Sequence, residues 1–153
     1  MKRLINVVVI LFFIQVNVYA NEDDLNYIRA NYNKAVSDKI LCAQIIQDLK
    51  LKKDEPVYMG YLGGFQAIWA SHVFSPITKL KVFNQGKEHI ENAIKQDPEN
   101  IELRFIRLSV QKNAPSFLGY SSMIDQDIDF LKTHRKEIRS NVVIKNVETL
   151  LKD

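Results

Sequence analysis

Apolar residues recur at intervals of three and four along almost the whole chain, and no segment alternates apolar and polar residues as a half-buried strand does. This period predicts helices separated by short polar turns. The predicted helices cover residues 24–36, 38–49, 56–73, 76–96, 101–113, 122–131 and 141–151. The pattern therefore predicts an all-α protein with three antiparallel helical hairpins and a C-terminal helix.

The turn residues support these boundaries. Pro56 and Pro76 each fall at a predicted helix start, where a missing N–H is harmless, and Pro98 and Pro115 fall in turns. Residues 37–38 mark either a cap between the first two helices or a mild break in one long helix.

Three of the five glycines fall in one stretch, "YMGYLGGFQAIWASH", residues 58–72. A phosphate-binding loop carries Lys or a hydroxyl residue after its glycines, whereas Phe65 follows them here. On a helix, the small residues of the stretch form one stripe and its aromatic residues another. The small stripe is Gly60, Gly64, Ala67 and Ser71. We therefore predict a close-packing seam against the helix of residues 76–96.

That neighbouring helix contains a second set of small residues in the segment "GKEHIENAIKQDPEN". Gly86 and Ala93 let two helices approach closely, Ile90 fills the gap between them, and Pro98 forces the next turn. The spacing of these four residues resembles the second half of a tetratricopeptide repeat.

The resemblance is best over residues 79–98 and extends over about residues 57–111. It departs from the family at Arg104 and Arg107, which stand where bulky apolar residues are usual. The resemblance implies a right-handed superhelix, with a compact bundle as the alternative, and it implies protein or peptide binding on a concave helical surface. The whole chain also resembles small exported bacterial helical proteins.

The first twenty residues have the layout of a secretory signal peptide. Lys2 and Arg3 precede an apolar run, and Val18-Tyr19-Ala20 offers a cleavage site before an abruptly polar segment. The apolar run is about 15 residues long, shorter than the roughly 20 that a membrane-spanning helix needs, which makes an uncleaved anchor the less favoured alternative. We expect cleavage after Ala20, a mature single domain over residues 21–153 in the periplasm or outside the cell, and no stable membrane span.

The signal peptide takes two of the 21 basic residues and none of the 18 acidic ones, so the mature chain is nearly neutral. This balance does not require a nucleic acid or an anionic membrane as partner. Cys42 is the only cysteine and lies among apolar residues, which predicts a buried thiol; an intermolecular disulfide or a reactive thiol is the alternative.

No motif for catalysis, a cofactor or a metal is found. His72, His89 and His134 lie in different predicted helices. The acids of "DQDID" lack the Gly and Glu of a calcium-binding loop, and Asp125 completes a capping-box-like start with Ser122. We therefore expect these acids to lie at the N-terminal end of a helix, where negative charge is stabilising.

One polar face remains as a candidate for recognition. Arg104, Arg107 and Gln111 lie at three- and four-residue spacing, opposite Phe105 and Leu108. We hypothesise that the three bind an acidic or C-terminal carboxylate group of a partner. The alternative is a solvated helix face or intramolecular salt bridges.

These features favour a non-catalytic protein-interaction scaffold of the bacterial envelope. The alternatives are an enzyme, or a small-ligand or lipid carrier, with a cleft at an unrecognised site. For the enzyme, the loops of residues 71–78 and 117–121 are the candidate positions for the cleft, whereas a carrier would need an apolar cavity between the hairpins.

Overall fold

The computed structural model describes residues 22–152, and the predicted signal peptide lies outside this range. Over the described residues the chain is all-α and has no strand, which confirms the predicted fold class. Residues 22–31 form an N-terminal helix. The elements that follow are η1 (Lys34–Val36), α2 (Lys39–Lys50), α3 (Pro56–His72), α4 (Pro76–Gln96), α5 (Ile101–Asn113), η2 (Ser116–Leu118), α6 (Ile124–His134), η3 (Arg135–Glu137) and α7 (Asn141–Lys152).

Side-chain caps are present at the starts of α2, α4 and α5. Asp38 accepts a hydrogen bond from the backbone N–H of Leu41 at α2, and Ser75 accepts one from Thr78 at α4. Asn100 caps α5 by accepting hydrogen bonds from the backbone N–H groups of Glu102 and Leu103. The capping box predicted at Ser122 does not form, because α6 begins at Ile124 without a side-chain cap.

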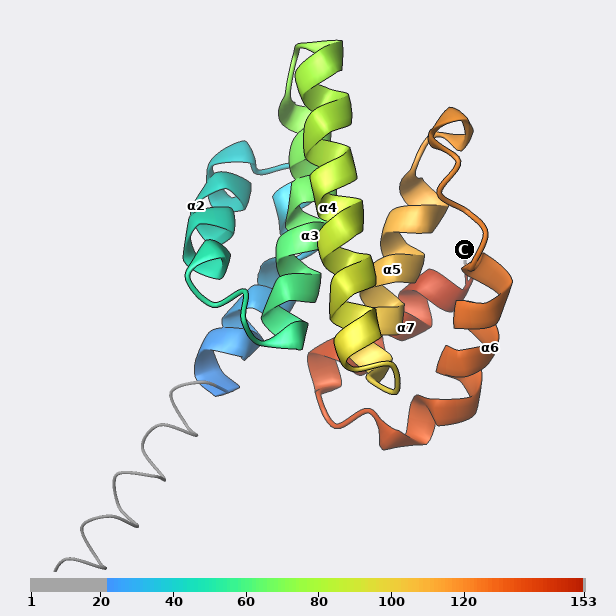
Figure 1. Ribbon diagram of the computed structural model, residues 1–153. Coiled ribbons are helices and arrows are strands. Elements are labelled where there is room, and N and C mark those ends of the chain that lie inside the picture. The colour runs from blue at the N-terminus through green and yellow to red at the C-terminus, as the bar shows by residue number, and fades with distance from the viewer. Residues whose placement is uncertain (1–21, 153) are drawn as a thin grey trace, which may run out of the picture.

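The α3 helix lies at the centre of the molecule, between α2 on one side and α4 and α5 on the other (Figure 1). Its side chains Tyr58, Tyr61 and Phe65 are fully buried. Tyr32, which follows the N-terminal helix, meets Tyr61 and Phe65 edge-to-face, with ring centroids 5.5 and 5.3 Å apart. The aromatic face of the glycine-rich stretch is therefore the core of the protein.

The glycine-rich stretch is helical, and its closest approach to α4 is at Gly63. A Cβ atom added to Gly63 would lie 2.4 Å from the carbonyl oxygen of Gly86, and one added to Gly86 would lie 2.6 Å from the carbonyl oxygen of Gly63. Ile90 and Ala93 are buried on the same side of α4. A seam between α3 and α4 therefore exists, with Gly63 and Gly86 at its tightest point.

The predicted membership of this seam needs correction. Gly64 faces the ring of Tyr32, and Gly60 faces Leu103 of α5, with Ala93 of α4 more distant. Ser71 is exposed and donates to a carbonyl of its own helix. The stripe of small residues is therefore divided among three neighbours, because helices pack on α3 from several sides.

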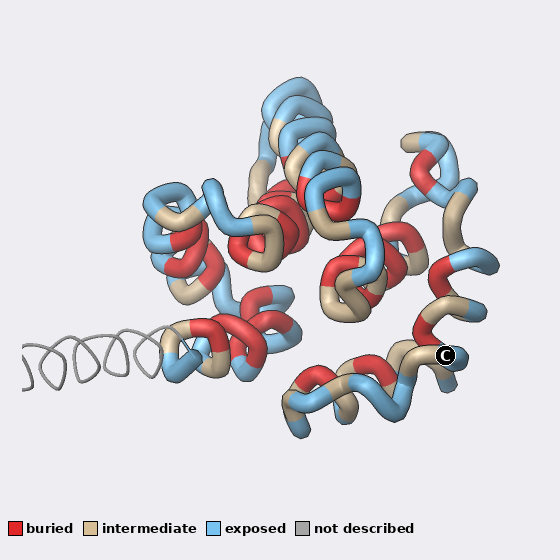
Figure 2. The backbone as a smooth tube through the Cα atoms, turned by 60° about the horizontal axis from the view of Figure 1, so that its bottom comes forward, coloured by how far each residue is buried: buried red, intermediate tan, exposed pale blue. Residues whose placement is uncertain are grey.

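The C-terminal half packs around α5. Both α6 and α7 contact α5 (Figure 1). The end of the α3–α4 hairpin extends beyond the other helices at the top of Figure 1, and residues 74–81 at that end are all exposed (Figure 2). Within residues 22–152, none of the helices combines the length and the apolar character that crossing a bilayer requires.

Candidate functional site

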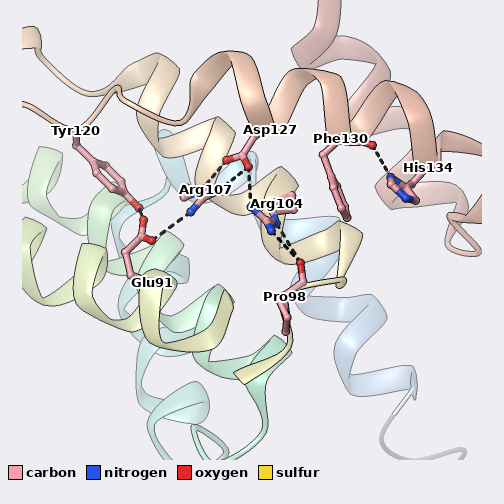
Figure 3. Close-up of polar contacts among 8 residues, drawn as sticks. All are labelled: Glu91, Pro98, Arg104, Arg107, Tyr120, Asp127, Phe130 and His134. Atoms are coloured by element: carbon pink, nitrogen blue, oxygen red, sulfur yellow. Dashed lines mark hydrogen bonds and ion pairs between the residues drawn. The ribbon is translucent and has the colours of Figure 1, made fainter. Parts of the chain in front are cut away.

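Two of the three residues predicted to form a recognition face, Arg104 and Arg107, point from α5 toward α6 (Figure 3). The guanidinium of Arg107 donates from Nε and Nη2 to the two carboxylate oxygens of Asp127 in α6, both at 2.6 Å. Both side chains are buried. Burial alone would lower the pKa of Arg107, but its bonds to Asp127 and the charge of that carboxylate raise the pKa overall.

Arg104 also contacts the carboxylate of Asp127. Its Nη1 lies 3.3 Å from Asp127 Oδ1, and its Nε and Nη2 donate to the carbonyl oxygen of Pro98 at 3.2 and 3.0 Å. The guanidinium also stacks over the ring of Phe130 in α6, 4.9 Å from the centroid, and that ring stacks on His134. Arg104 thus ties the α4–α5 turn to α6.

A second carboxylate extends the network to α4. Glu91 accepts from Arg107 Nη1 at 3.1 Å and from the hydroxyl of Tyr120 at 2.6 Å (Figure 3). Burial and the hydrogen bond to Glu91 both raise the pKa of Tyr120, so the phenol stays protonated at neutral pH. We call Glu91, Arg104, Arg107, Tyr120 and Asp127 the α4–α6 network. It connects three helices and the loop before α6 through charged hydrogen bonds.

Gln111, the third predicted recognition residue, is buried one turn beyond Arg107, and neither polar atom of its side-chain amide has a partner within the described residues. None of the three predicted residues therefore offers an open surface in this structure. Intramolecular salt bridges, which the sequence left as the alternative, are what the structure has for Arg104 and Arg107.

A separate polar network joins the N-terminal helix to α5. Arg29 donates to both oxygens of Glu102 at 2.7 and 2.8 Å, and the hydroxyl of Tyr61 donates to the same carboxylate. Burial and the charge of Glu102 raise the pKa of Tyr61 well above its usual value. The pair holds the first described helix against the core.

An open cleft of about 960 Å³ lies beside the Arg29–Glu102 pair. Its walls are the N-terminal helix, the α4–α5 turn and the connection from η3 to α7. Glu99, Lys136 and Arg139 line it, are exposed, and have no side-chain partner among the described residues. Side chains of both charge signs are therefore available here, in contrast to the paired charges of the two networks.

The histidines and Cys42, which the sequence also raised as candidates, interact with other groups of the protein itself. The imidazole of His72 is 2.9 Å from the carbonyl of Ala35, and His89 is 2.7 Å from the amide oxygen of Gln66. Burial lowers the pKa of His89. Cys42 is a free, fully buried thiol whose pKa is raised to about 11, mainly by burial. In residues 22–152, no group of three or more His, Cys, Asp or Glu side chains is placed to hold a metal ion.

Sequence reasoning missed the acidic partners of the buried arginines. Asp127 shares a helix face with Ile124 and Leu131, at spacings of three and four, so it occupies a position in the apolar stripe of α6. An acid at such a position signals a buried cation opposite it. On α5, Arg107 lies four residues after the buried Leu103 and therefore on the same helix face. A cation at this position likewise indicates a buried acid opposite it.

No protein-family model, curated protein or solved structure matches the chain.

Proposed function

We propose that the protein is an exported, non-catalytic scaffold of the bacterial envelope that binds a protein or peptide partner. The observation that carries this proposal is the open cleft beside Arg29 and Glu102, where exposed charges of both signs lack internal partners. A polypeptide offers ammonium, carboxylate and backbone groups that would pair with such a surface. The tetratricopeptide-like spacing in α4 agrees with a role in binding polypeptides.

The protonation states of the buried groups also favour a binding role. A general acid or base works best with a pKa near the operating pH. The shifted tyrosines and Cys42 have raised pKa values, and His89 has a lowered one, so each of these groups stays neutral at neutral pH. The cleft is open and lined largely by charged residues, which does not suit the apolar ligand of a lipid carrier.

Site-specific photo-crosslinking in the native envelope tests the proposal. A photoreactive residue at Lys136 is expected to crosslink a discrete partner protein, and the same residue at exposed Gln44 of α2 is the control. Charge reversal by Arg139→Glu is expected to weaken the Lys136 crosslink. Equal crosslinking from both positions, or none from Lys136, would contradict the proposal.

The export step has its own test, because it rests on residues outside the described range. Intact-mass measurement of the protein recovered from the cell envelope is expected to show a chain that begins at Asn21. A full-length mass would refute cleavage without bearing on the cleft.

A further inference from the structure

The charge of the mature chain is nearly balanced overall, but it is unevenly distributed. Neither Asp nor Glu occurs between Glu55 and Glu88, a range that contains all of α3 and the first half of α4. Lys79 and Lys81 lie in this range, and both are exposed at the projecting end of the hairpin. That end is therefore cationic without any acidic residue of its own.

The same end carries three exposed large apolar side chains, among them Phe74, the most exposed one of the described residues. Phe74, in the connection from α3 to α4, is 101% exposed relative to the reference state, Ile77 is 84% exposed and Leu80 is 47% exposed. Ile77 and Leu80 are three residues apart and share one side of α4, directly after Phe74. We call residues 73–81 the hairpin tip.

The hairpin tip projects away from the other helices (Figure 1), so its apolar residues lie on a protrusion. A stable protein partner would need a matching surface that buries about 800 Å² on each side. A bilayer surface deforms around a protruding apolar group and needs no such match. Apolar side chains flanked by lysines fit a membrane whose acyl chains accept Phe74 and Ile77 while its anionic headgroups pair with Lys79 and Lys81.

We propose that the hairpin tip docks on the surface of an anionic phospholipid bilayer. Phe74 and Ile77 enter the boundary between headgroups and acyl chains, and Lys79 and Lys81 contact the phosphates. The attachment is peripheral. It uses a surface of the molecule different from the open cleft, so the scaffold would bind its partner while attached to the membrane.

Vesicle co-sedimentation of the mature protein, residues 21–153, tests the proposal. We expect binding to vesicles of mixed phosphatidylcholine and phosphatidylglycerol, and much weaker binding to phosphatidylcholine alone. Binding is expected to weaken as salt rises, because screening shortens the reach of the lysine charges. The Lys79→Gln/Lys81→Gln variant is expected to bind more weakly by about fivefold for each lysine.

The apolar part of the tip is tested with a matched control. Phe74→Ser/Ile77→Ser is expected to weaken binding at least about tenfold, since two apolar side chains no longer enter the bilayer. Phe117→Ser changes another exposed phenylalanine, which lies outside the hairpin tip, and this variant is expected to bind as the wild type does. All these positions are exposed, so thermal unfolding should be unchanged in each variant.

A tryptophan placed at the hairpin tip reports whether the tip enters the bilayer. In Trp69→Phe/Phe74→Trp, the only tryptophan lies at the tip, and its emission is expected to shift to the blue and to be quenched by brominated lipids. The proposal is overturned if the wild-type protein does not bind anionic vesicles, or if Phe74→Ser/Ile77→Ser binds them as well as the wild type does. It is also overturned if the tip variants abolish capture of a protein while no vesicle binds, because the tip would then be a protein-docking site.

Discussion

Arg107 and Asp127 form a buried, bidentate ion pair that joins α5 to α6, with both N–O distances at 2.6 Å. The side chain of Asp127 is fully buried and that of Arg107 is nearly so. Removing two charges from water is unfavourable, and the attraction within such a pair offsets this only when the geometry is good and the remaining polar atoms are bonded. Here Arg104 and Glu91 supply the additional bonds.

Removing one member of this pair should therefore destabilise the protein strongly. We expect Asp127→Ala to lower the free energy of unfolding by about 3–5 kcal/mol, because Arg107 is left as a buried charge without its main partner. Urea denaturation followed by circular dichroism measures the change. Asp129→Ala, an exposed acid on the same helix, is the control and is expected to change stability by about 0.5 kcal/mol or less.

A double variant tests whether the destabilisation comes from leaving one charge buried without its partner. Arg107→Met/Asp127→Leu replaces both charges with apolar side chains and is expected to recover most of the stability that Asp127→Ala loses. If Asp127→Ala unfolds at the same urea concentration as Asp129→Ala, the pair does not hold α6 in place.

The glycine seam predicts different outcomes at neighbouring positions. Alanine favours a helix over glycine by about 1 kcal/mol. At Gly63 a Cβ would meet the backbone oxygen of Gly86, which cannot move without separating the helices, so Gly63→Ala is expected to destabilise by about 1–3 kcal/mol. At Gly60 the nearest atom is the end of the Leu103 side chain, so Gly60→Ala should be close to neutral.

Thermal unfolding of the two variants side by side checks this difference. Gly86→Ala provides a second test, because its Cβ would approach the backbone of Gly63. A melting temperature for Gly63→Ala no lower than that of the wild type would show that α3 and α4 can separate without loss, and would contradict the seam.

The helices were predictable from the sequence because their signals are local. Pro56 and Pro76 stand in the first turns of α3 and α4, and Asp38 and Ser75 cap α2 and α4. The division of the small-residue stripe was not predictable, because spacing alone does not show which neighbour meets Gly64.

The candidate site was less predictable than the helices. Arg104 and Arg107 do share a face, but the sequence places no element opposite them, and that element decides whether they meet solvent or Asp127. The open cleft is formed by three segments far apart in the chain, and no local pattern marks it.

Buried tyrosines make stability depend on alkaline pH. Burial raises the pKa of Tyr32 to about 12, and the pKa values of Tyr58, Tyr61 and Tyr120 are also raised. A tyrosine in the unfolded chain has a pKa of about 10. Because the folded state holds these protons more tightly, their stabilising contribution is complete below about pH 10 and is lost as the pH rises through the folded pKa values.

We therefore expect the free energy of unfolding to fall above about pH 10, and Tyr32→Phe to make that fall shallower. From a folded pKa of about 12, removing the Tyr32 hydroxyl should reduce the loss between about pH 9 and pH 11 by about 1 kcal/mol. At neutral pH the variant should be less stable by about 1 kcal/mol, since the hydrogen bond to Ser109 is lost. Urea denaturation at several pH values measures both effects. Tyr27→Phe removes the hydroxyl of an exposed tyrosine and is the control. An identical slope in Tyr32→Phe and the wild type would show that Tyr32 does not contribute to the pH dependence.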